Sequence, residues 1–435
     1  MKTIKYAQEQ EIPVIDSVDV LVIGGGPGGL GATVMAARQG VKTMLVERFG
    51  CMGGMAFHGE VNPFMYNHVN SCSLDRPVFI DWCTAMQKYL SPAEAERIPY
   101  DSNYGMTLVS KEFAMLAMED LVLDSGAKIL YHHTISDVVM DENKNIKYAI
   151  FQSKSGRIAI ESKVFIDCTG DGDLAAIANC EYELGDENNV CQPLTTCFKL
   201  GNIDRNNIPD KKTINLLYEE AKAKGEIDCP RKDVLFFTAI DQDVLHFNTT
   251  RIVNKSAINS LELSEAEIEG RRQIRQFINF LRKNVPGFEN ATIRSVAPTV
   301  GIRESRRIKG IAYQTQEDFF NRAKYEDGIA KCNYTIDIHG ANNGADHIVR
   351  MDRTQWYEIR FGTLVAADCN NLLIGCRALS VDHTLHSSIR IMPSICSIGQ
   401  AAGMGAALAV KANVSPKDID GKVVRRELIK AGAPL

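Results

Sequence analysis

The stretch VDVLVIGGGPGG, residues 18–29, decides the fold of this chain. Residues 18–23 are apolar apart from Asp19 and mostly β-branched, which predicts a strand buried on both faces of a parallel sheet. A glycine-rich turn follows, then a helical pattern over residues 30–38 closed by Gly40, and a second strand over residues 41–47. A strand, a glycine turn, a helix and a strand in this order predict a βαβ unit.

The turn fits the pattern G-x-G-x-x-G between a strand and a helix, the context that gives this pattern its meaning. Gly24 allows the tight turn, Gly26 lets the backbone approach a pyrophosphate, and Gly29 lets the helix pack on the strand. Glu47 ends the second strand, where its carboxylate can accept hydrogen bonds from an adenosine ribose and would repel the 2′-phosphate of NADP. We therefore expect a bound dinucleotide with its phosphates at the helix N-terminus. The predicted binding residues of this unit are Gly24, Gly26, Pro27, Gly28, Gly29, Glu47 and Arg48.

Three further segments favour FAD over NAD. Residues 50–55 (GCMGGM) follow the acidic residue directly, and such bare backbone suits a chain that runs beside an extended FAD. Residues 169–173 (TGDGD) form a second glycine turn after the buried strand 164–168. A helix predicted from Pro393 can bring its positive end against the N1–C2=O side of a reduced flavin. We predict non-covalent FAD, held in addition by Met52, Gly53, Gly54, Met55, Thr169, Gly170, Asp171, Gly375, Met392 and Gln400.

The rest of the pattern predicts an interrupted domain. Apolar spacing predicts a helix over residues 111–124. Further strands are expected near residues 129–131, 136–140, 146–152, 157–160, 164–168 and 371–374, and the turn-rich connections among the second to fourth of these predict a small antiparallel meander. The βαβ rhythm is lost between about residues 175 and 356. A long helix is predicted there, beginning at the capping box of Ser264 and Glu267 and ending before Pro286.

The predicted fold class is therefore α/β. A Rossmann-like FAD-binding domain, with a parallel sheet and a small antiparallel meander, is expected to be built from both chain ends, residues 1–175 and 361–435. An inserted α+β domain at residues 176–360 is expected to cover the flavin and supply the substrate pocket. The long helix predicted from Pro393 is the last segment of the chain that is expected to contribute to the cofactor site.

Composition excludes several classes of protein. Lys plus Arg number 49 and Asp plus Glu number 54, and the net charge of −5 offers no field for nucleic acid. No run of about 18 uncharged apolar residues predicts a membrane span, and residues 1–16 lack the apolar core of a signal peptide. Twelve cysteines without a CxxC pair predict free thiols in a reducing compartment, the cytoplasm, and no metal site is expected. The sequence does not indicate an oligomeric state.

Several motifs resemble those of the FAD-dependent oxidoreductase family, among the glutathione-reductase-like flavoproteins. They are GGM at residues 53–55, GIRESRRI at 301–308, IDIHG at 336–340 and SxRxMPxxxxxGQAAG at 388–403. The resemblance implies FAD and hydride exchange at flavin N5. The chain departs from the family at residues 56–59 (AFHG), which are bulkier than expected. Thr384 and Ser387 also stand where Glu and Gly are common, so substrate choice can differ from that of relatives.

Three residues near the final predicted strand are candidates for catalysis. Hydride transfer from an alcohol or amine needs a proton acceptor, and imidazole suits that task. His383 and His386 lie between the final strand and the helix from Pro393, although either could instead bond the flavin or the loop backbone. Arg390 could hold the flavin C2=O, bind a substrate carboxylate or form a structural salt bridge.

Candidates for substrate binding are His58, Arg303 and His339. Arg303 belongs to a charge cluster at residues 303–307 that is bracketed by apolar residues, and this cluster is either an internal network near the flavin or a solvated face. His339 is either a pocket residue or a core histidine. Cys51 lacks the second cysteine of the C-x-x-x-x-C relay of flavin disulfide reductases.

The predicted function is that of an FAD-dependent oxidoreductase exchanging a hydride between flavin N5 and a small organic substrate. Two alternatives stay open: a flavin-assisted elimination or isomerisation without net redox turnover, and a flavoprotein in which FAD is structural or senses redox state. A second G-x-G-x-x-G unit after a strand is missing, so no NAD(P)H domain is expected.

Overall fold

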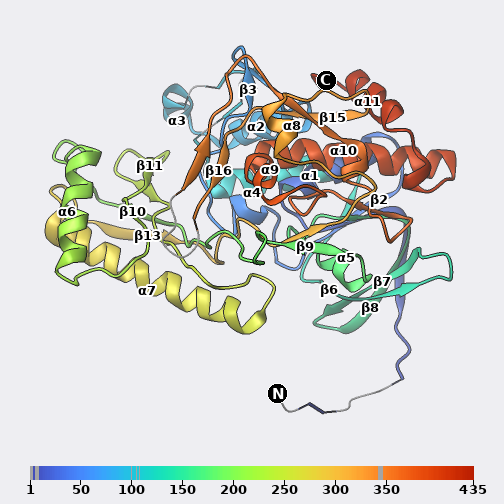
Figure 1. Ribbon diagram of the computed structural model, residues 1–435, viewed down its shortest axis with the longest axis horizontal. Helices are drawn as coiled ribbons and strands as arrows, with labels where there is room; N and C mark the ends of the chain where they lie inside the picture. Colours follow the sequence, from blue (N-terminus) through green and yellow to red (C-terminus); the bar gives the residue numbers. More distant parts are fainter. Residues whose placement is uncertain (1–2, 5–8, 99, 104, 107, 341–345) are drawn as a thin grey trace.

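The computed structural model describes residues 3–4, 9–98, 100–103, 105–106, 108–340 and 346–435. A seven-stranded sheet lies at its centre (Figure 1). The strand order is β5-β2-β1-β8-β7-β6, with β19 paired to β8. These strands are β1 (Val14–Ile23), β2 (Thr43–Val46), β5 (Lys128–Leu130), β6 (Thr134–Met140), β7 (Ile146–Ser153), β8 (Gly156–Asp167) and β19 (Leu372–Ile374).

Five of the seven strands are parallel, as the apolar runs predicted. β1 pairs in parallel with β2 and β8, β5 with β2, and β19 with β8. The carboxyl ends of these strands therefore meet at one edge of the sheet, where ligands bind in open α/β folds. The glycine turn after β1, Glu47 after β2 and Thr169 after β8 lie together at this edge because of the register.

The structure corrects the sequence interpretation of residues 157–168. Two strands were expected, one in the meander and one in the parallel sheet, but β8 is continuous from Gly156 to Asp167. Its first half pairs antiparallel with β7, and its last residues pair in parallel with β19. Glu161 is the last residue that pairs with β7, and Lys163 lies in the strand between the pairing with β7 and the pairing with β19.

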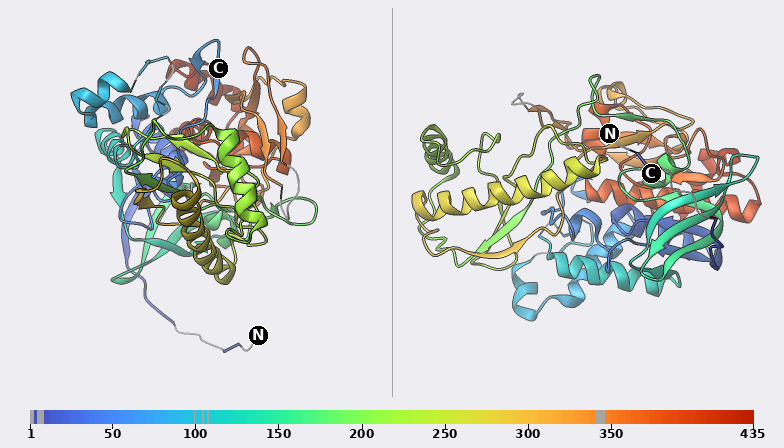
Figure 2. Two further views of the ribbon diagram at one scale, coloured as in Figure 1. Left: turned by 90° about the vertical axis from the view of Figure 1, so that its left-hand side faces the viewer. Right: turned by 90° about the horizontal axis from the view of Figure 1, so that it is seen from below.

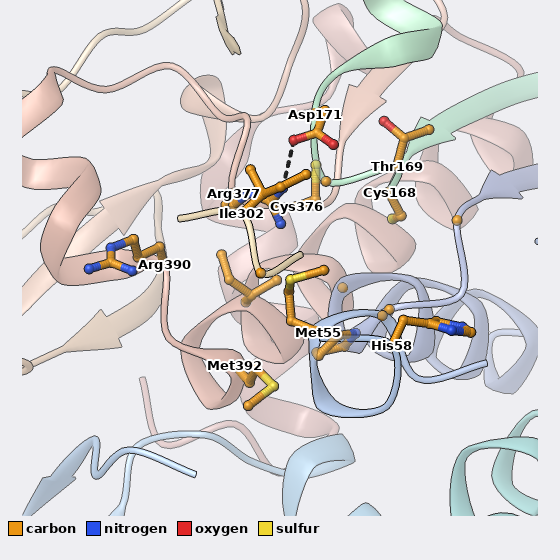
Figure 3. Close-up of a pocket in the computed structure, with 18 of the residues that line it drawn as sticks. Met55, His58, Cys168, Thr169, Asp171, Ile302, Cys376, Arg377, Arg390 and Met392 are labelled. Atoms are coloured by element: carbon orange, nitrogen blue, oxygen red, sulfur yellow. Dashed lines mark hydrogen bonds and ion pairs between the residues drawn. The ribbon is translucent and has the colours of Figure 1, made fainter. Parts of the chain in front are cut away.

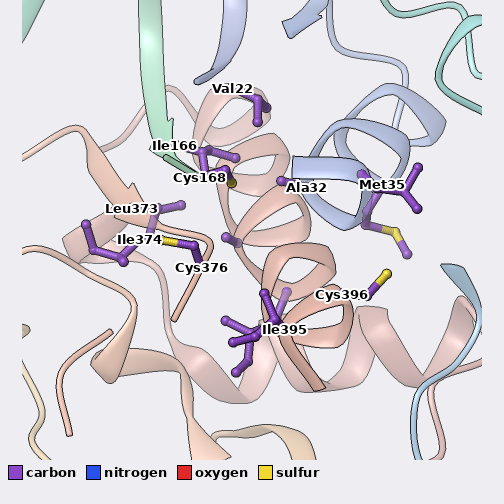
Figure 4. Close-up of a cluster of buried hydrophobic side chains, with 14 of the residues drawn as sticks. Val22, Ala32, Met35, Ile166, Cys168, Leu373, Ile374, Cys376, Ile395 and Cys396 are labelled. Carbon is purple, nitrogen blue, oxygen red and sulfur yellow. The ribbon is translucent and has the colours of Figure 1, made fainter. Parts of the chain in front are cut away.

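Two helices pack on the sheet with unusually close contact. They are α1 (Pro27–Arg38) and α10 (Met392–Ala412), which cross beside the central strands (Figures 1 and 4). A Cβ added to Gly399 would lie 2.0 Å from the carbonyl oxygen of Gly28, and one added to Gly403 would lie 2.2 Å from that of Ala32. The glycines of GQAAG therefore let the two helices come together.

Helix α10 is long and apolar enough to cross a membrane by length and composition alone. Of its most apolar window, 78% is buried inside the protein. Its apolar side chains are covered by α1 and the sheet, as in the core helix of a globular protein.

A second layer of structure lies to one side of the main sheet in two views (Figures 1 and 2). Its four-stranded sheet has the order β11-β12-β10-β13, and a separate buried cluster fills the space between this sheet and two helices. The elements are β10 (Phe198–Gly201), α6 (Lys211–Ala223), β11 (Phe236–Thr238), β12 (Leu245–Phe247), α7 (Ser260–Asn284) and β13 (Thr292–Val296). The segments after residue 306 pack instead with the core of the main sheet.

Helix α7 has the predicted apolar face but a different start. Ile274, Phe277, Ile278 and Leu281 are buried together, as their spacing predicted. The expected capping box is wrong, because Asn259 caps the helix and its side chain accepts hydrogen bonds from the backbone N–H groups of Leu261 and Glu262. Ser264 lies one turn inside the helix.

The remaining elements are short and connect these layers. Helix α4 has the predicted bounds of residues 111–124. The set comprises β3 (His68–Val69), β4 (Cys72–Ser73), α2 (Val78–Met86), α3 (Pro92–Arg97), α4 (Lys111–Asp124), α5 (Asp173–Ile177), β9 (Tyr182–Leu184), β14 (Arg306–Ile308), α8 (Gln316–Phe320), β15 (Gly328–Cys332), β16 (Ile336–Ile338), β17 (His347–Val349), β18 (Tyr357–Arg360), α9 (His383–Ile389) and α11 (Gly421–Lys430).

Candidate active site

A cavity of about 750 Å³ runs along the carboxyl edge of the parallel strands. This volume lies in the range of sites that hold a cofactor or small ligand. One end, here called the dinucleotide end, is lined by the glycine turn, Glu47, Arg48, residues 133–135 and residues 169–171. The other, here called the distal end, is lined by Tyr334, Asp337, His339, Arg303 and Arg390. Figure 3 shows His58 and Arg390 on opposite sides of the cavity, with Met55 and Met392 between them.

The glycine turn has the geometry that a pyrophosphate needs. Gly24 has φ +107°, and a Cβ there would lie 2.3 Å from the carbonyl oxygen of Cys168, so only glycine fits. Gly26 is the N-cap of α1 and lines the cavity, and the nearest atom to a Cβ added there is 3.6 Å away. The first N–H groups of α1 lack partners within the helix, which makes this end a site for an anion.

Glu47 fixes the turn as well as lining the cavity. Its Oε2 accepts a hydrogen bond of 2.6 Å from the backbone N–H of Gly25, and its Oε1 accepts one of 2.9 Å from that of Phe49. Each carboxylate oxygen has a further lone pair, so the side chain can still accept bonds from a ribose.

Five of the residues expected to contact FAD lie away from the cavity lining. Gly29 packs the start of α1 against the turn, because a Cβ there would lie 1.9 Å from the carbonyl oxygen of Gly24. Met52 is fully buried in the hydrophobic core, and Gly53 lies behind Gly54 and Met55, which do line the cavity. Gly375 packs against Cys168 and the start of α1. Gln400 is held by α2, because its side chain accepts from the backbone N–H of Val78 and donates to the carbonyl of Arg76. These five residues shape the fold beside the site, and the remaining predicted FAD contacts all line the cavity.

An arginine that the sequence interpretation missed enters the cavity after β19. Arg377 donates a hydrogen bond of 2.6 Å to Asp171, which also accepts one of 2.6 Å from Ser305 (Figure 3). The sequence could have indicated Arg377, because it follows the final strand and so lies at the same edge of the sheet as Asp171. The cluster at residues 303–307 proves to be internal, because Glu304, Ser305 and Arg307 are buried.

The two histidines proposed for catalysis do not line this cavity. They belong to helix α9 and not to a loop. His383 Nδ1 lies 2.8 Å from Oε1 of the buried Glu304 and faces a separate surface hollow. His386 is fully buried, and within the described residues neither of its ring nitrogens has a hydrogen-bond partner. Burial, followed by the charge of Arg307, lowers the pKa of His386 well below its usual value. Of the three predicted catalytic residues, only Arg390 lines the cavity.

Polar groups from separate segments meet at the distal end. Arg390 donates to the carbonyl of Asp337 at 3.1 Å and lies 3.7 Å from its Oδ2. His339 Nε2 lies 3.5 Å from the same carboxylate oxygen. Arg303 donates a hydrogen bond of 2.7 Å to the carbonyl of Pro193. The sequence interpretation named Arg303, His339 and Arg390 but missed Asp337, which stands two residues before His339.

These charges set the protonation states of the distal end. Burial, the charge of Arg303 and that of Arg390 lower the pKa of His339, although Asp337 opposes them. Burial alone would raise the pKa of Asp337, but the hydrogen bond from His339 and the charges of Arg390 and Arg303 hold it well below its usual range. At neutral pH the imidazole is therefore neutral and the carboxylate is charged.

The third predicted substrate residue, His58, lies nearer the dinucleotide end. Its ring packs on Phe49 with centroids 4.0 Å apart, and its Nε2 lies 3.3 Å from the carbonyl oxygen of Cys51. Arg303, His339 and Arg390 thus lie together at the distal end. His58 lies on the opposite side of the cavity from Arg390 (Figure 3).

The model of one protein family, described as FAD dependent oxidoreductase, matches residues 19–428. The chain belongs to this family. Among curated proteins, it is 31% identical over 176 residues to a thiamine thiazole synthase of Methanococcus vannielii, covering 38% of this chain and 61% of that one. It is 25% identical over 178 residues to the synthase of Metallosphaera sedula, covering 38% and 60%. The chain thus spans about three fifths of these relatives.

Solved structures of flavoproteins are similar in outline to this FAD-dependent oxidoreductase. A flavin-dependent brominase gives a TM-score of 0.49 at 11% identity, covering 94% of this chain and 83% of that chain. A geranylgeranyl bacteriochlorophyll reductase-like protein of Thermoplasma acidophilum gives 0.46 at 13% identity, covering 95% and 83%. Membership of the family rests on the match across residues 19–428, which confirms the resemblance, the α/β flavoprotein fold and FAD as cofactor.

Proposed function

We propose that this FAD-dependent oxidoreductase exchanges a hydride with a small organic molecule bound at the distal end of the cavity. The observation that carries the proposal is the single cavity that joins the glycine turn to Arg303, His339 and Arg390. A cofactor bound at the turn and a substrate bound at the distal end would share one cavity, which would hold the two reactants close together as hydride exchange requires.

The dinucleotide end fits FAD. Gly26 leaves open space where a pyrophosphate would approach α1, and Glu47 has lone pairs for a ribose. Arg377 places a positive charge on the same edge of the sheet, held by Asp171. When bound, FAD supplies a hydride acceptor or donor at N5 of its ring.

His339 is the residue best placed to move a proton at the distal end. Its imidazole is neutral at neutral pH, so it can accept a proton from a substrate hydroxyl or amine. The Asp337 carboxylate, 3.5 Å from Nε2, would stabilise the imidazolium that results. His383 and His386 lack access to the cavity, and their proposed role therefore passes to His339.

The inserted segment would complete the site. Thr195, Asn248 and Ile302 line the cavity and come from residues 176–360, whereas the glycine turn comes from residues 1–175. We further place the enzyme in the cytoplasm, because all twelve cysteines are free thiols.

An anaerobic substrate screen tests the proposed reaction. Purified holoenzyme is mixed with candidate alcohols, amines and acids, and the visible absorption of oxidised flavin is followed. We expect a substrate to bleach that band, and dithionite to bleach it in a control without substrate. Product formed without bleaching would contradict hydride exchange and favour an elimination or isomerisation.

A further inference from the structure

Two guanidinium groups line the distal end of the cavity from different elements. Arg303 follows Gly301 and Ile302, and Arg390 is the C-cap residue of α9. Burial, and then the charge of Arg390, lower the pKa of Arg303 to about 9. Arg303 is thus still charged at neutral pH, and the two guanidinium groups repel each other. Such an arrangement is costly in a protein unless an anion compensates it.

Both guanidinium groups are anchored on one side and have donors left over. Arg390 uses Nη2 on the carbonyl of Asp337, at 3.1 Å, and on Oε1 of Gln192, at 3.5 Å. Its Nε is buried and has no hydrogen-bond partner in the described part of the chain. Arg303 uses Nη1 on the carbonyl of Pro193. Because arginine carries five N–H donors, both groups can still donate to a ligand.

The charge balance of this end is positive. Among the described residues that line the cavity, the acidic ones are Glu47, Asp171, Asp173 and Asp337, and the first three lie at or beside the dinucleotide end. Of these four acidic residues, Asp337 is therefore the one that faces the two arginines. It also faces His339, which is neutral. Arg251 and Arg231 lie nearby, but their charges are matched by Asp346 and Asp233 at 2.5 and 2.8 Å. One positive charge remains without a partner.

We propose that Arg303 and Arg390 form a subsite for the carboxylate of a small monocarboxylic acid. The inference rests on the proposed function, since the acid would be the substrate of that same cavity. One unmatched positive charge fits a monoanion, and the planar fork of a guanidinium fits a carboxylate through two parallel hydrogen bonds. Val61, Met65 and Ile302 supply apolar walls for the body of such a ligand.

Binding to the oxidised holoenzyme tests this subsite without turnover. Acetate, lactate and benzoate are titrated by calorimetry and by perturbation of the flavin absorption spectrum, each against its amide, which has nearly the same shape but no charge. We expect saturable binding of at least one acid, and binding of its amide at least tenfold weaker. Equal binding of acid and amide, or tighter binding of inorganic phosphate than of every acid, would overturn the carboxylate assignment.

Variants locate the binding on these two arginines. Arg303→Gln and Arg390→Gln should each weaken acid binding at least tenfold, and Arg303→Lys should weaken it less because it keeps the charge. The matched control is Arg294→Gln, since Arg294 belongs to the inserted segment, pairs with Asp243 at 3.3 Å and lies outside the cavity. Unchanged acid affinity in both Arg303→Gln and Arg390→Gln would overturn the subsite. Retained FAD shows that each variant is folded, and the comparison of acid with amide needs no variant at all.

The two proposals fail differently. If acids do not bind but a neutral or cationic compound bleaches the flavin, the subsite is wrong and hydride exchange stands. If acids bind through the two arginines but no compound in the screen is oxidised or reduced, the subsite stands and the proposed reaction is wrong.

Discussion

His383 and Glu304 are joined by a contact of 2.8 Å between Nδ1 and Oε1 that turns the imidazole away from the cavity. The same oxygen of Glu304 accepts a hydrogen bond of 2.7 Å from Arg307, and its other oxygen accepts one of 3.1 Å from the backbone N–H of Gln192. The side chain of Gln192 in turn contacts Arg390. His383 is therefore connected to the distal end through this buried network, and we propose that it is a positioning residue.

His383→Ala should consequently have a small effect on flavin reduction. A catalytic base would cost roughly 10²–10⁴-fold when removed, and we expect that loss from His339→Gln instead. His383→Ala should cost about 1.5–3 kcal/mol of stability, the value of a hydrogen bond to a charged group. Stopped-flow reduction and urea unfolding separate the two variants. A large fall in the reduction rate of His383→Ala with stability unchanged would contradict the positioning role.

Gly26→Val should lose FAD while keeping the fold. A Cβ at Gly26 meets nothing closer than 3.6 Å in the protein, so the side chain would occupy the space of the pyrophosphate. Gly24→Val is the matched comparison, because its side chain would collide with the carbonyl of Cys168 at 2.3 Å and the protein itself should be destabilised. Flavin content and circular dichroism distinguish these outcomes. A yellow, stable Gly26→Val protein would place the pyrophosphate elsewhere.

Glu47→Ala should weaken both the cofactor site and the turn that builds it. Loss of bonds to a charged acceptor should reduce FAD affinity by roughly 1.5–3 kcal/mol. The backbone N–H groups of Gly25 and Phe49 would also lose their partner, so the protein without FAD should be less stable. Glu47→Gln keeps one good acceptor and should be affected less. Flavin affinity equal to that of the wild type in Glu47→Ala would rule out the ribose contact.

Local sequence patterns were enough to predict those elements whose structure depends on one continuous segment. The helix of residues 111–124 was predicted at its observed bounds from its apolar spacing, although its buried face is made by Ala114, Ala117, Met118 and Val122, and Leu116 is exposed. The turn at residues 24–29 was predicted because strand, turn and helix are consecutive. The continuity of β8 was missed because β7 and β19 share one edge of it, and a pairing of this kind depends on residues 148 and 372, far apart in the sequence.

For the distal end of the cavity, the sequence indicated single residues but not their arrangement. Arg303, Asp337 and Arg390 come from three segments that no sequence spacing relates, so the charge balance that they create was not visible. His383 and Arg390 are seven residues apart, about 10 Å along a helix at 1.5 Å per residue. Helix α9 therefore separates two residues that a loop could have brought to the same place.

His386→Leu should stabilise the protein, most strongly at acidic pH. The buried imidazole lacks hydrogen-bond partners in the described structure, and such a group costs about 1–3 kcal/mol that an apolar side chain of similar volume does not. Because its pKa is lowered in the folded state, the unfolded chain binds a proton more readily below about pH 6.5, the usual value. Wild-type stability is therefore lost through this group as pH falls. Urea unfolding at pH 5 and 8 should show the advantage of the variant growing toward pH 5.

The pKa of His339 should report the charges of the distal end without any substrate. Arg303 lowers this pKa and Asp337 raises it. Arg303→Gln should therefore raise the pKa above that of the wild type, Asp337→Asn should lower it, and Arg303→Lys should leave it close to the wild type. Histidine-selective NMR of the holoenzyme measures the order, with His339→Gln assigning the resonance.

The same order should appear in the reaction once a substrate is known. Because we propose the neutral imidazole as the proton acceptor, kcat/KM should be constant from neutral pH up to the pKa of Arg303, about 9, and should fall at lower pH when His339 becomes protonated. This acidic limb should move to higher pH in Arg303→Gln and to lower pH in Asp337→Asn. If the limb stays in place while the NMR titration shifts, another group accepts the proton, and Tyr334, which also lines the distal end, becomes the residue to replace.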